Sequence, residues 1–287
     1  MKTTIKTTAI AICTFMATAL QAQELKSFEE NGKYGLKDQS GKVIVEAKYS
    51  ECRKDGEVFR VEINLEWGLI DGKTGKEIIA PKYLTMNEFS EGLAWVQLDR
   101  KGGYINTTGK VVIPIAYDAY EMGNDFYEGT ATVAKDGKHG VIDKTEKILV
   151  PFKYQSIGEF SEGIASVGLS DKFGFVDKSG KEITPAKYDD VQRFKNGFAK
   201  VSAAYKWGII DKNGKEIIAV KYDDIHDFTN GLACVGIGDN WGYVDTTGKE
   251  IIPLQFEKTY WADNEIIYAR RADGTIEKFD KKGNKIK

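Results

Sequence analysis

Short apolar runs bounded by glycine and polar residues recur along the whole chain, and their pattern predicts β-strands. Residues 93–98, Leu-Ala-Trp-Val-Gln-Leu, are rich in residues that favour strands. A Trp-Gly-x-Ile-Asp segment predicts a second strand, and Lys-Glu-Ile-Ile predicts a third after an Asp-x-x-Gly turn. No stretch of useful length shows the 3.6-residue period of a helix. Each unit is therefore expected to be a three-stranded antiparallel β-meander.

This pattern returns at a nearly constant period of about 34 residues. The glycine of Trp-Gly, or of its weaker copies, lies at positions 35, 68, 103, 140, 174, 208 and 242. A degenerate eighth copy ends the chain at Phe279-Asp280. In the seven full copies an aromatic residue closes the third strand: Tyr49, Tyr83, Tyr117, Tyr154, Tyr188, Tyr222 and Phe256. We expect each Trp to pack between units and each Gly to allow a close backbone approach.

The five prolines all fall near one position of the repeat. Four of them share it, and Pro81 lies one residue later; the four are Pro114, Pro151, Pro185 and Pro253. Proline has no N–H to donate, so it is expected to end the ladder of the third strand.

About eight such units fill the chain, which predicts a single all-β repeat domain over residues 23–287. The neighbouring Ile217 and Ile218 point to opposite faces of a strand, so each meander is expected to be sandwiched between two others. Both an open superhelical array and a closed eight-bladed β-propeller satisfy this condition. The unit is shorter than the 40–45 residues of a usual blade, which favours the open array.

The repeated signature Trp-Gly-x-Ile-Asp-x-x-Gly-Lys-x-Ile-x-Pro-x-x-Tyr resembles the bacterial WG-repeat family, also called KWG repeats. The resemblance covers essentially all of the chain after residue 22. It implies a protein that is secreted or associated with the cell envelope, and for most members it implies no assigned biochemical activity. A fainter similarity links the aromatics and Asp-x-x-Gly hairpins to choline-binding cell-wall repeats, whose ligand-cage spacing is absent here.

The first 22 residues have the pattern of a signal peptide. Lys2 and Lys6 precede an apolar stretch over residues 8–20, and Ala22 offers a cleavage site. The protein is therefore expected to be secreted or periplasmic. No later segment approaches the roughly 20 apolar residues of a membrane-spanning helix.

Charge and residue counts exclude several classes of function. The 41 basic and 43 acidic residues give a formal net charge of -2 and are interspersed, which argues against a nucleic-acid partner. The two histidines and the widely spaced cysteines form no zinc pattern, and one Asp per hairpin supplies too few oxygens for calcium. We therefore expect no metal and no cofactor.

No catalytic residue is assigned. The pair Asp189-Asp190 resembles the carboxylate pair of a glycosidase, but it occupies a repeat position where another unit has Ser50-Glu51, which indicates a solvated turn. His139 and His226 have no identifiable Ser or Cys partner for nucleophilic catalysis.

Binding residues are sought among unexpected aromatics. Trp95 falls at a variable position that is expected to face outward, and exposed aromatics mark interaction sites. Tyr127, in the longest segment between repeats, and Trp261, in the last return, are the other candidates; local packing is the alternative for each. The sequence thus predicts a non-enzymatic scaffold that binds an envelope protein or peptide, with a carbohydrate or cell-wall glycan binding module as the alternative.

Overall fold

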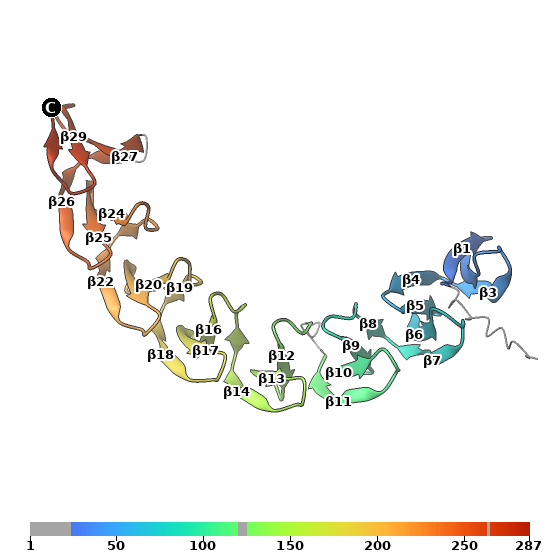
Figure 1. Ribbon diagram of the computed structural model, residues 1–287. Coiled ribbons are helices and arrows are strands. Elements are labelled where there is room, and N and C mark those ends of the chain that lie inside the picture. The colour runs from blue at the N-terminus through green and yellow to red at the C-terminus, as the bar shows by residue number, and fades with distance from the viewer. Residues whose placement is uncertain (1–23, 120–124, 263–264) are drawn as a thin grey trace, which may run out of the picture. The chain divides into compact units, whose positions relative to one another are not determined.

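The structure is a computed structural model that describes residues 24–119, 125–262 and 265–287. These residues form strands and turns, with no helix among them (Figure 1). A helix long and apolar enough to cross a membrane is accordingly absent from the described part. The predicted signal peptide, residues 1–22, lies outside the described residues.

The described strands form eight antiparallel sheets, which we number 1–8 in chain order. Sheet 1 contains β1 (Lys26–Glu30), β2 (Lys33–Lys37) and β3 (Val43–Tyr49). Sheet 2 contains β4 (Glu51–Asp55), β5 (Val58–Ile63), β6 (Glu66–Asp71) and β7 (Glu77–Tyr83). Sheet 3 contains β8 (Thr85–Met86), β9 (Leu93–Leu98), β10 (Lys101–Asn106) and β11 (Val111–Asp118). Sheet 4 contains β12 (Thr130–Lys135), β13 (Lys138–Asp143) and β14 (Ile148–Tyr154).

The remaining four sheets repeat the same strand order. Sheet 5 contains β15 (Ser156–Ile157), β16 (Ile164–Leu169), β17 (Lys172–Asp177) and β18 (Glu182–Tyr188). Sheet 6 contains β19 (Asp190–Val191), β20 (Phe198–Ala203), β21 (Lys206–Asp211) and β22 (Glu216–Tyr222). Sheet 7 contains β23 (Asp224–Ile225), β24 (Leu232–Ile237), β25 (Asn240–Asp245) and β26 (Glu250–Phe256). Sheet 8 contains β27 (Lys258–Ala262), β28 (Ile266–Arg270), β29 (Ile276–Asp280) and β30 (Lys285–Ile286).

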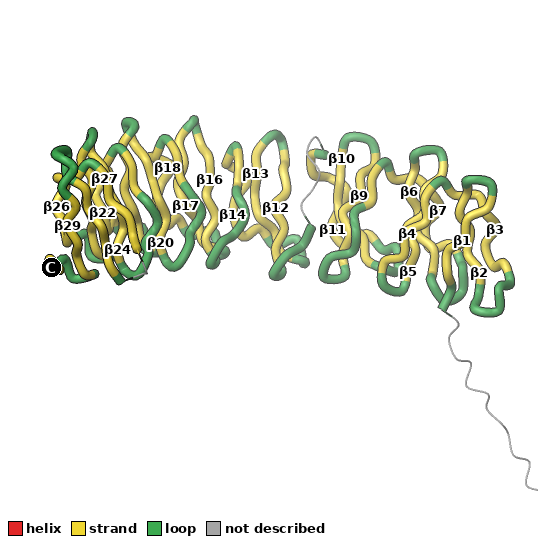
Figure 2. Tube along the Cα trace, turned by 90° about the horizontal axis from the view of Figure 1, so that it is seen from above, coloured by secondary structure: helices red, strands yellow, loops and turns green. Residues whose placement is uncertain are grey.

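The chain divides into two compact units. One comprises the residues up to Met86 with Thr107–Gly109, and the other comprises Asn87–Asn106 and Lys110–Lys287. Within the second unit the sheets follow one another in chain order (Figure 2). None of the described sheets combines strands from both ends of the chain. The prediction of an all-β open repeat array is confirmed; that of one domain over residues 23–287 stays a prediction.

Six of the eight described sheets have four strands, so the prediction of three-stranded meanders is incomplete. The return segment after the closing aromatic adds a short first strand. In sheet 6, Asp190 and Val191 pair with Ser202 and Val201 of β20. A strand of two residues is too short to show an alternating pattern, which is why the sequence indicated an irregular return.

In sheets 1–7 the strand after Trp-Gly, which is the third of the predicted meander and is called the third strand below, bulges over the glycine. In sheet 2, Trp67 pairs with Tyr83 but Leu69 pairs with Ile79, so the third strand takes two extra residues to cover the same length. A Cβ on Gly68 would lie 2.6 Å from the carbonyl oxygen of Ile79. Backbone of the third strand lies within 2.4–2.6 Å of a Cβ built on the glycines at five further copies, namely Gly35, Gly103, Gly174, Gly208 and Gly242. The predicted close approach is confirmed.

The prolines occupy this bulge, and the third strand continues beyond them. Pro253 lies inside β26, between Ile252 and Phe256, which pair with Tyr243 and Trp241. The expectation that proline ends the ladder is therefore wrong. The bulge already leaves this part of the strand without a ladder partner, so the missing N–H costs nothing and pairing resumes at the closing aromatic.

Consecutive sheets of the second unit bury their facing sides on each other. One core cluster joins Phe175 and Tyr188 of sheet 5 to Val201 and Ile210 of sheet 6, all of them buried. Because both faces of an inner sheet are covered in this way, each repeat depends on its neighbours for burial of its apolar side chains.

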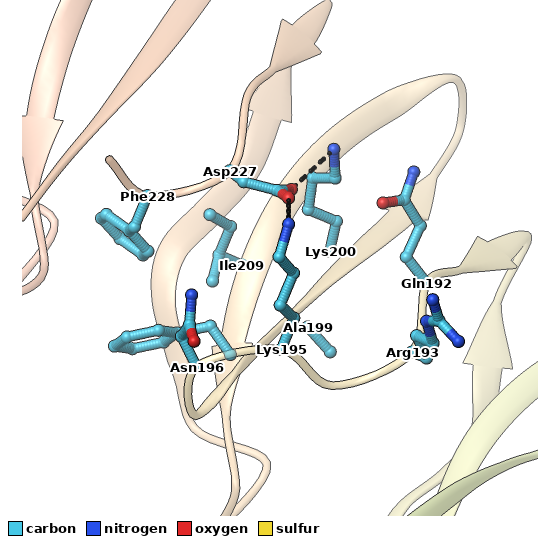
Figure 3. A pocket seen from close by; sticks show the side chains of 10 residues that line it. Gln192, Arg193, Lys195, Asn196, Ala199, Lys200, Ile209, Asp227 and Phe228 are labelled. Carbon is cyan, nitrogen blue, oxygen red and sulfur yellow. Dashed lines mark hydrogen bonds and ion pairs between the residues drawn. The ribbon is translucent and has the colours of Figure 1, made fainter. Parts of the chain in front are cut away.

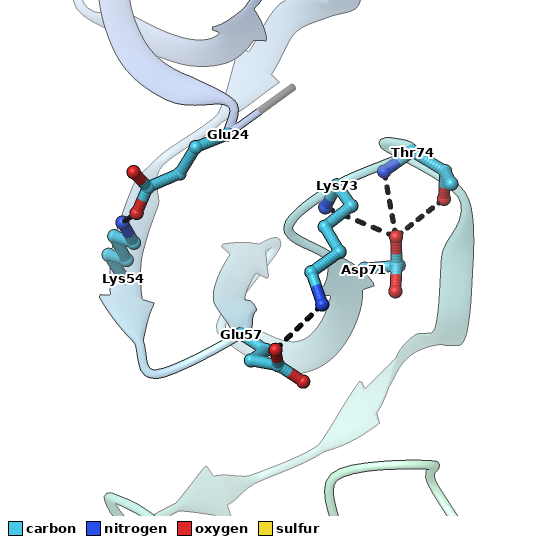
Figure 4. A network of polar contacts seen from close by, with 6 residues as sticks. All are labelled: Glu24, Lys54, Glu57, Asp71, Lys73 and Thr74. Atoms are coloured by element: carbon cyan, nitrogen blue, oxygen red, sulfur yellow. Dashed lines mark hydrogen bonds and ion pairs between the residues drawn. The ribbon is translucent and has the colours of Figure 1, made fainter. Parts of the chain in front are cut away.

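In the hairpin turns that begin with Asp, the carboxylate of this residue holds the turn. Figure 4 shows Asp71 accepting hydrogen bonds from the backbone N–H (2.7 Å) and the hydroxyl (2.6 Å) of Thr74. Lys73 of this turn forms an ion pair with Glu57 at 2.7 Å. The hydroxyl of Thr74 lowers the pKa of the Asp71 carboxyl, and the hydroxyls of Ser40 and Thr145 do the same for the pKa values of Asp38 and Asp143.

Replacement of Gly208 by Ala is expected to destabilise the protein. The new Cβ would lie 2.6 Å from the carbonyl oxygen of Ile218 and 2.8 Å from the backbone nitrogen of Val220, atoms that cannot move without the strand. The cost of such overpacking is about 1–3 kcal/mol, measured as the shift in thermal melting. Gly168→Ala is the matched control, because its nearest neighbour is the mobile hydroxyl of Ser156. Equal melting of both variants would contradict this explanation of the motif.

The turn carboxylates predict a loss of stability in acid. A folded-state pKa that is lowered stabilises the fold above the pKa of the unfolded chain, about 3.9, and this contribution is lost as the pH falls through the folded value. The melting temperature should therefore drop from pH 5 to pH 2. The triple variant D38N, D71N, D143N should melt lower at pH 6 and lose less over the same range. Asn106 already accepts a bond from the backbone N–H of Lys110 at this position, so Asn keeps the turn. Superimposable pH profiles of the two proteins would refute this role.

Candidate functional site

In sheets 4–7 a loop carrying a Phe-x-x-Gly motif precedes the strand that comes before Trp-Gly, and its phenylalanine contacts the preceding sheet. We call this residue the loop phenylalanine, and we call the place where sheet n meets sheet n + 1 junction n/n + 1. The four junctions compared below, 3/4 to 6/7, are built from residues of the second unit alone. Their loop phenylalanines are Phe126, Phe160, Phe194 and Phe228.

Junctions 3/4 and 5/6 are closed by a serine. The residue after the loop phenylalanine of sheet 5 is Ser161, whose hydroxyl donates to the carbonyl oxygen of Phe194 at 2.7 Å. The equivalent Ser90 donates to the carbonyl oxygen of Phe126 at 2.6 Å. Each bond joins two consecutive loops directly.

A glutamate reinforces both of these junctions. Glu162 accepts a hydrogen bond from the backbone N–H of Gly197 at 3.0 Å and forms an ion pair with Lys212 at 2.8 Å. The lysine lowers the pKa of this carboxyl. In junction 3/4, Glu91 makes the same pair of contacts with Gly129 (3.1 Å) and Lys144 (2.9 Å).

Aromatic packing fills the space beneath the closed junctions. Phe194 is buried with its ring centroid 5.1 Å from that of Phe175 in β17, in an edge-to-face arrangement. Phe126 packs in the same way on Tyr104 of β10, at 4.8 Å. In both cases an aromatic residue directly follows the glycine of the Trp-Gly position and receives the loop phenylalanine of the next sheet.

Junctions 4/5 and 6/7 lack the serine bond and the aromatic pair, and both contain pockets. The serine is replaced by Tyr127 in one and Lys195 in the other, and the ring that follows the glycine of the Trp-Gly position is replaced by Val141 and Ile209. The loop phenylalanines of sheets 5 and 7 are only half-buried and line the pockets. The cavities measure about 730 Å³ at junction 4/5 and about 220 Å³ at junction 6/7. The pockets thus occupy the same place in the repeat, two repeats apart.

The pocket at junction 4/5 combines aromatic and acidic side chains. Tyr127 is 70% exposed at its rim, with Asp125, Glu159 and the half-buried Phe160. Lys178 lies over the ring of Phe160, 5.8 Å from its centroid. This lysine also forms an ion pair with Glu128, the counterpart of the glutamate in the closed junctions.

The pocket at junction 6/7 is dominated by basic side chains (Figure 3). Lys195 and Lys200 converge on Asp227 with ion pairs of 3.0 and 3.1 Å. The hydrogen bond from Lys195 lowers the pKa of Asp227. Arg193 lies beside Gln192, away from this ion pair.

The three residues predicted from the sequence have different outcomes. Trp95 is 1% exposed, so the expectation that it faces outward is wrong: its ring packs edge-to-face on Tyr104 in the core between sheets 3 and 4. Tyr127 lines the pocket at junction 4/5, although its role in binding is untested. Trp261 lies in β27 and pairs through its backbone with Ile267, and its side chain is outside the described part.

The sequence reasoning missed the charged residues of the pockets and one exposed tyrosine. Glu159 and Arg193 precede loop phenylalanines at the same repeat position, so comparison of the repeats at this position would have revealed the change of charge. Tyr205 is 95% exposed at the tip of the hairpin between β20 and β21. Its φ of 62° is one that favours glycine, and four other repeats place Gly or Asp there: Gly32, Gly137, Asp171 and Asp239.

The described residues include no group of three or more His, Cys, Asp or Glu side chains placed to hold a metal ion. Two thiols, Cys52 and Cys234, are free, and burial raises the pKa of Cys52 to about 11.

Comparison with known proteins identifies the repeat. A family model described as WG containing repeat matches seven consecutive segments: residues 34–64, 67–101, 103–138, 140–173, 173–206, 207–241 and 241–267. No curated protein matches the chain significantly.

Solved structures that align with the chain do so weakly. A eukaryotic initiation factor is 13% identical and covers 92% of this chain and 84% of its own, with a TM-score of 0.38. Hsv2p of Kluyveromyces lactis is 8% identical over 80% of this chain and 91% of its own, with a TM-score of 0.34. AztD from Citrobacter koseri is 10% identical over 92% and 93%, with a TM-score of 0.33. Likeness at this level carries no argument about function.

The junction serine gives a direct test of the closed state. Ser161→Ala removes the hydroxyl that bonds the carbonyl oxygen of Phe194, and the free energy of unfolding should fall by about 0.5–1.5 kcal/mol. Thr229→Ala is the matched control: Thr229 occupies the same repeat position, is exposed, and its hydroxyl has no described partner. Urea denaturation measures both. If the two variants lose the same stability, the serine bond does not close the junction.

Proposed function

The chain belongs to the family of WG containing repeats, and we propose that it is a non-enzymatic repeat scaffold that binds a protein or peptide partner at junctions 4/5 and 6/7. The observation that carries the proposal is the recurrence of a pocket at one repeat position, two repeats apart. A regular array of sheets holds such pockets at a fixed spacing, which suits recognition of an extended partner.

The make-up of the pockets supports binding. They present a largely exposed ring, two half-buried phenylalanines and charged side chains on ordered loops. The residues that contribute most of the binding energy at protein interfaces are often aromatic or basic, and they lie in partly desolvated pockets. The loops are anchored by their phenylalanines, so the pockets are largely formed before a partner arrives, and this lowers the entropic cost of binding.

A carbohydrate is the second candidate ligand, because one observation favours it. At junction 4/5 the exposed ring of Tyr127 lies with the carboxylates of Asp125 and Glu159 and the hydroxyls of Thr130 and Thr132. An aromatic face combined with several hydrogen-bonding groups is a suitable surface for a sugar ring.

Location outside the cytoplasm is part of the proposal. It is supported by the basic and apolar pattern of residues 1–22, which has the form of a secretory signal. Mass spectrometry of the protein recovered from cells can show whether residues 1–22 have been removed. An intact Met1 would contradict the proposed location.

Peptide selection tests the proposed function. A displayed library of random twelve-residue peptides is selected on the full chain, and the enriched peptides are then measured against the double variant Y127S, K195S, which carries the serine of the closed junctions. We expect their affinity to fall at least about tenfold, since these side chains line the two pockets.

The control is Tyr205→Ser, which removes another exposed tyrosine of the second unit away from the pockets. It should leave peptide affinity unchanged. Failure to enrich any peptide, or equal binding by all three proteins, would refute the peptide-scaffold proposal. Binding to a glycan array that is lost in Y127S, without peptide enrichment, would favour the carbohydrate candidate instead.

A further inference from the structure

The two pockets occupy equivalent positions in the repeat but carry opposite charge. Each pocket is lined by two residues that directly precede a loop phenylalanine, one from each of the two sheets that meet at the junction. They are Asp125 and Glu159 at junction 4/5, and Arg193 and Asp227 at junction 6/7. One backbone geometry therefore presents two different recognition chemistries along the same set of loops.

The pocket at junction 4/5 favours a cation. Glu159 is exposed and makes no hydrogen bond or ion pair with any described residue, so its charge is available. The protein already places one ammonium group there, that of Lys178, over the ring of Phe160. An aromatic face beside carboxylates attracts a further ammonium or guanidinium group both through the ring and through the charges. The exposed Tyr127 supplies a second ring for this purpose.

The pocket at junction 6/7 favours an anion. Lys195 and Lys200 share the single carboxylate of Asp227, which leaves one positive charge in excess. Arg193 adds another, because it is exposed and makes no ion pair with a described residue. Its planar guanidinium is suited to a carboxylate, which it can bind through two parallel hydrogen bonds.

The spacing of the pockets fits a peptide. Sheets that pack face to face lie about 10 Å apart, so two repeats correspond to about 20 Å. An extended chain rises about 3.3 Å per residue and covers this span in about six residues. A peptide is a polymer that offers both a basic and an acidic side chain at such a separation.

We propose that junctions 4/5 and 6/7 together bind one extended peptide segment of a partner protein, with a basic side chain in the first pocket and an acidic side chain, about six residues away, in the second. This inference rests on the proposed scaffold function and adds the charge pattern and the direction of the ligand.

The test uses the twelve-residue peptide library on the full chain and on two charge-reversal variants, Glu159→Arg and Arg193→Glu. Peptides selected by the unaltered protein should contain Lys or Arg and Asp or Glu about six positions apart, in one order. Selection on Glu159→Arg should lose the preference for the basic residue and keep the acidic one, and selection on Arg193→Glu should do the reverse. Lys138→Glu, an exposed charge reversal outside the pockets, should select the same peptides as the unaltered protein.

Fluorescence anisotropy with one selected synthetic peptide makes the test quantitative. Each pocket variant should bind it at least about tenfold more weakly. A peptide whose basic residue is replaced by Glu should regain affinity for Glu159→Arg, which shows that the effect is charge pairing and not misfolding.

Two results would overturn the inference, and they differ from failure of the scaffold proposal. Peptides that lose binding in the double variant Y127S, K195S but show no charge pattern would leave the scaffold function standing and remove the charge-paired ligand. If Glu159→Arg and Arg193→Glu select peptides with the same charged residues as the unaltered protein, the charge-paired ligand is likewise removed and the scaffold function stands. Failure to select any peptide would remove the scaffold function itself.

Discussion

Each repeat depends on one close contact between two backbone segments. The third strand bulges over the glycine of Trp-Gly, and at Gly208 a Cβ would lie 2.6 Å from the carbonyl oxygen of Ile218. Because no side chain fits there, the strand can pass over the glycine and then pair its closing aromatic, Tyr222, directly with Trp207. The bulge also accommodates proline without the loss of a ladder bond. Both defining residues of the repeat, the glycine and the closing aromatic, follow from this single constraint.

Much of the fold could be predicted from the sequence because the same pattern of residues occurs in about eight copies. The turn aspartates, the close approach at glycine and the antiparallel units were all visible in it. Two features were not. A strand of two residues carries no periodic signal, and the variable position in the strand before Trp-Gly resembles an exposed position because its residue type changes from repeat to repeat. At that position Arg60 donates to the carbonyl oxygen of Met86 at 3.0 Å, and Trp95 lies in the core.

The variable position changes because it faces the neighbouring repeat. Lys200 donates to the carbonyl oxygen of Ile225 at 3.4 Å, and the thiol of Cys234 lies 3.2 Å from the hydroxyl of Thr259, in the next sheet. Each side chain therefore matches what the following repeat presents, so variation along a repeat array indicates a changing neighbour as readily as it indicates solvent. Sequence comparison of one repeat with the next cannot separate these two causes, because the partner residue lies about 25 positions further along the chain.

The junctions that lack stabilising contacts between sheets are also the junctions that contain the proposed binding pockets. In the closed junctions an edge-to-face ring pair, a serine bond and a glutamate with two partners all stabilise the contact between sheets. In the open junctions the aliphatic Val141 and Ile209 take the place of the ring that receives the loop phenylalanine, and Tyr127 and Lys195 supply side chains to a pocket in place of the serine. Functional sites commonly carry such a local cost. Here the closed junctions 3/4 and 5/6 lie on either side of junction 4/5, so the loss of stability at this open junction falls between two stable contacts. Alternation of a few side chains on a constant backbone thus produces a scaffold with pockets at fixed intervals.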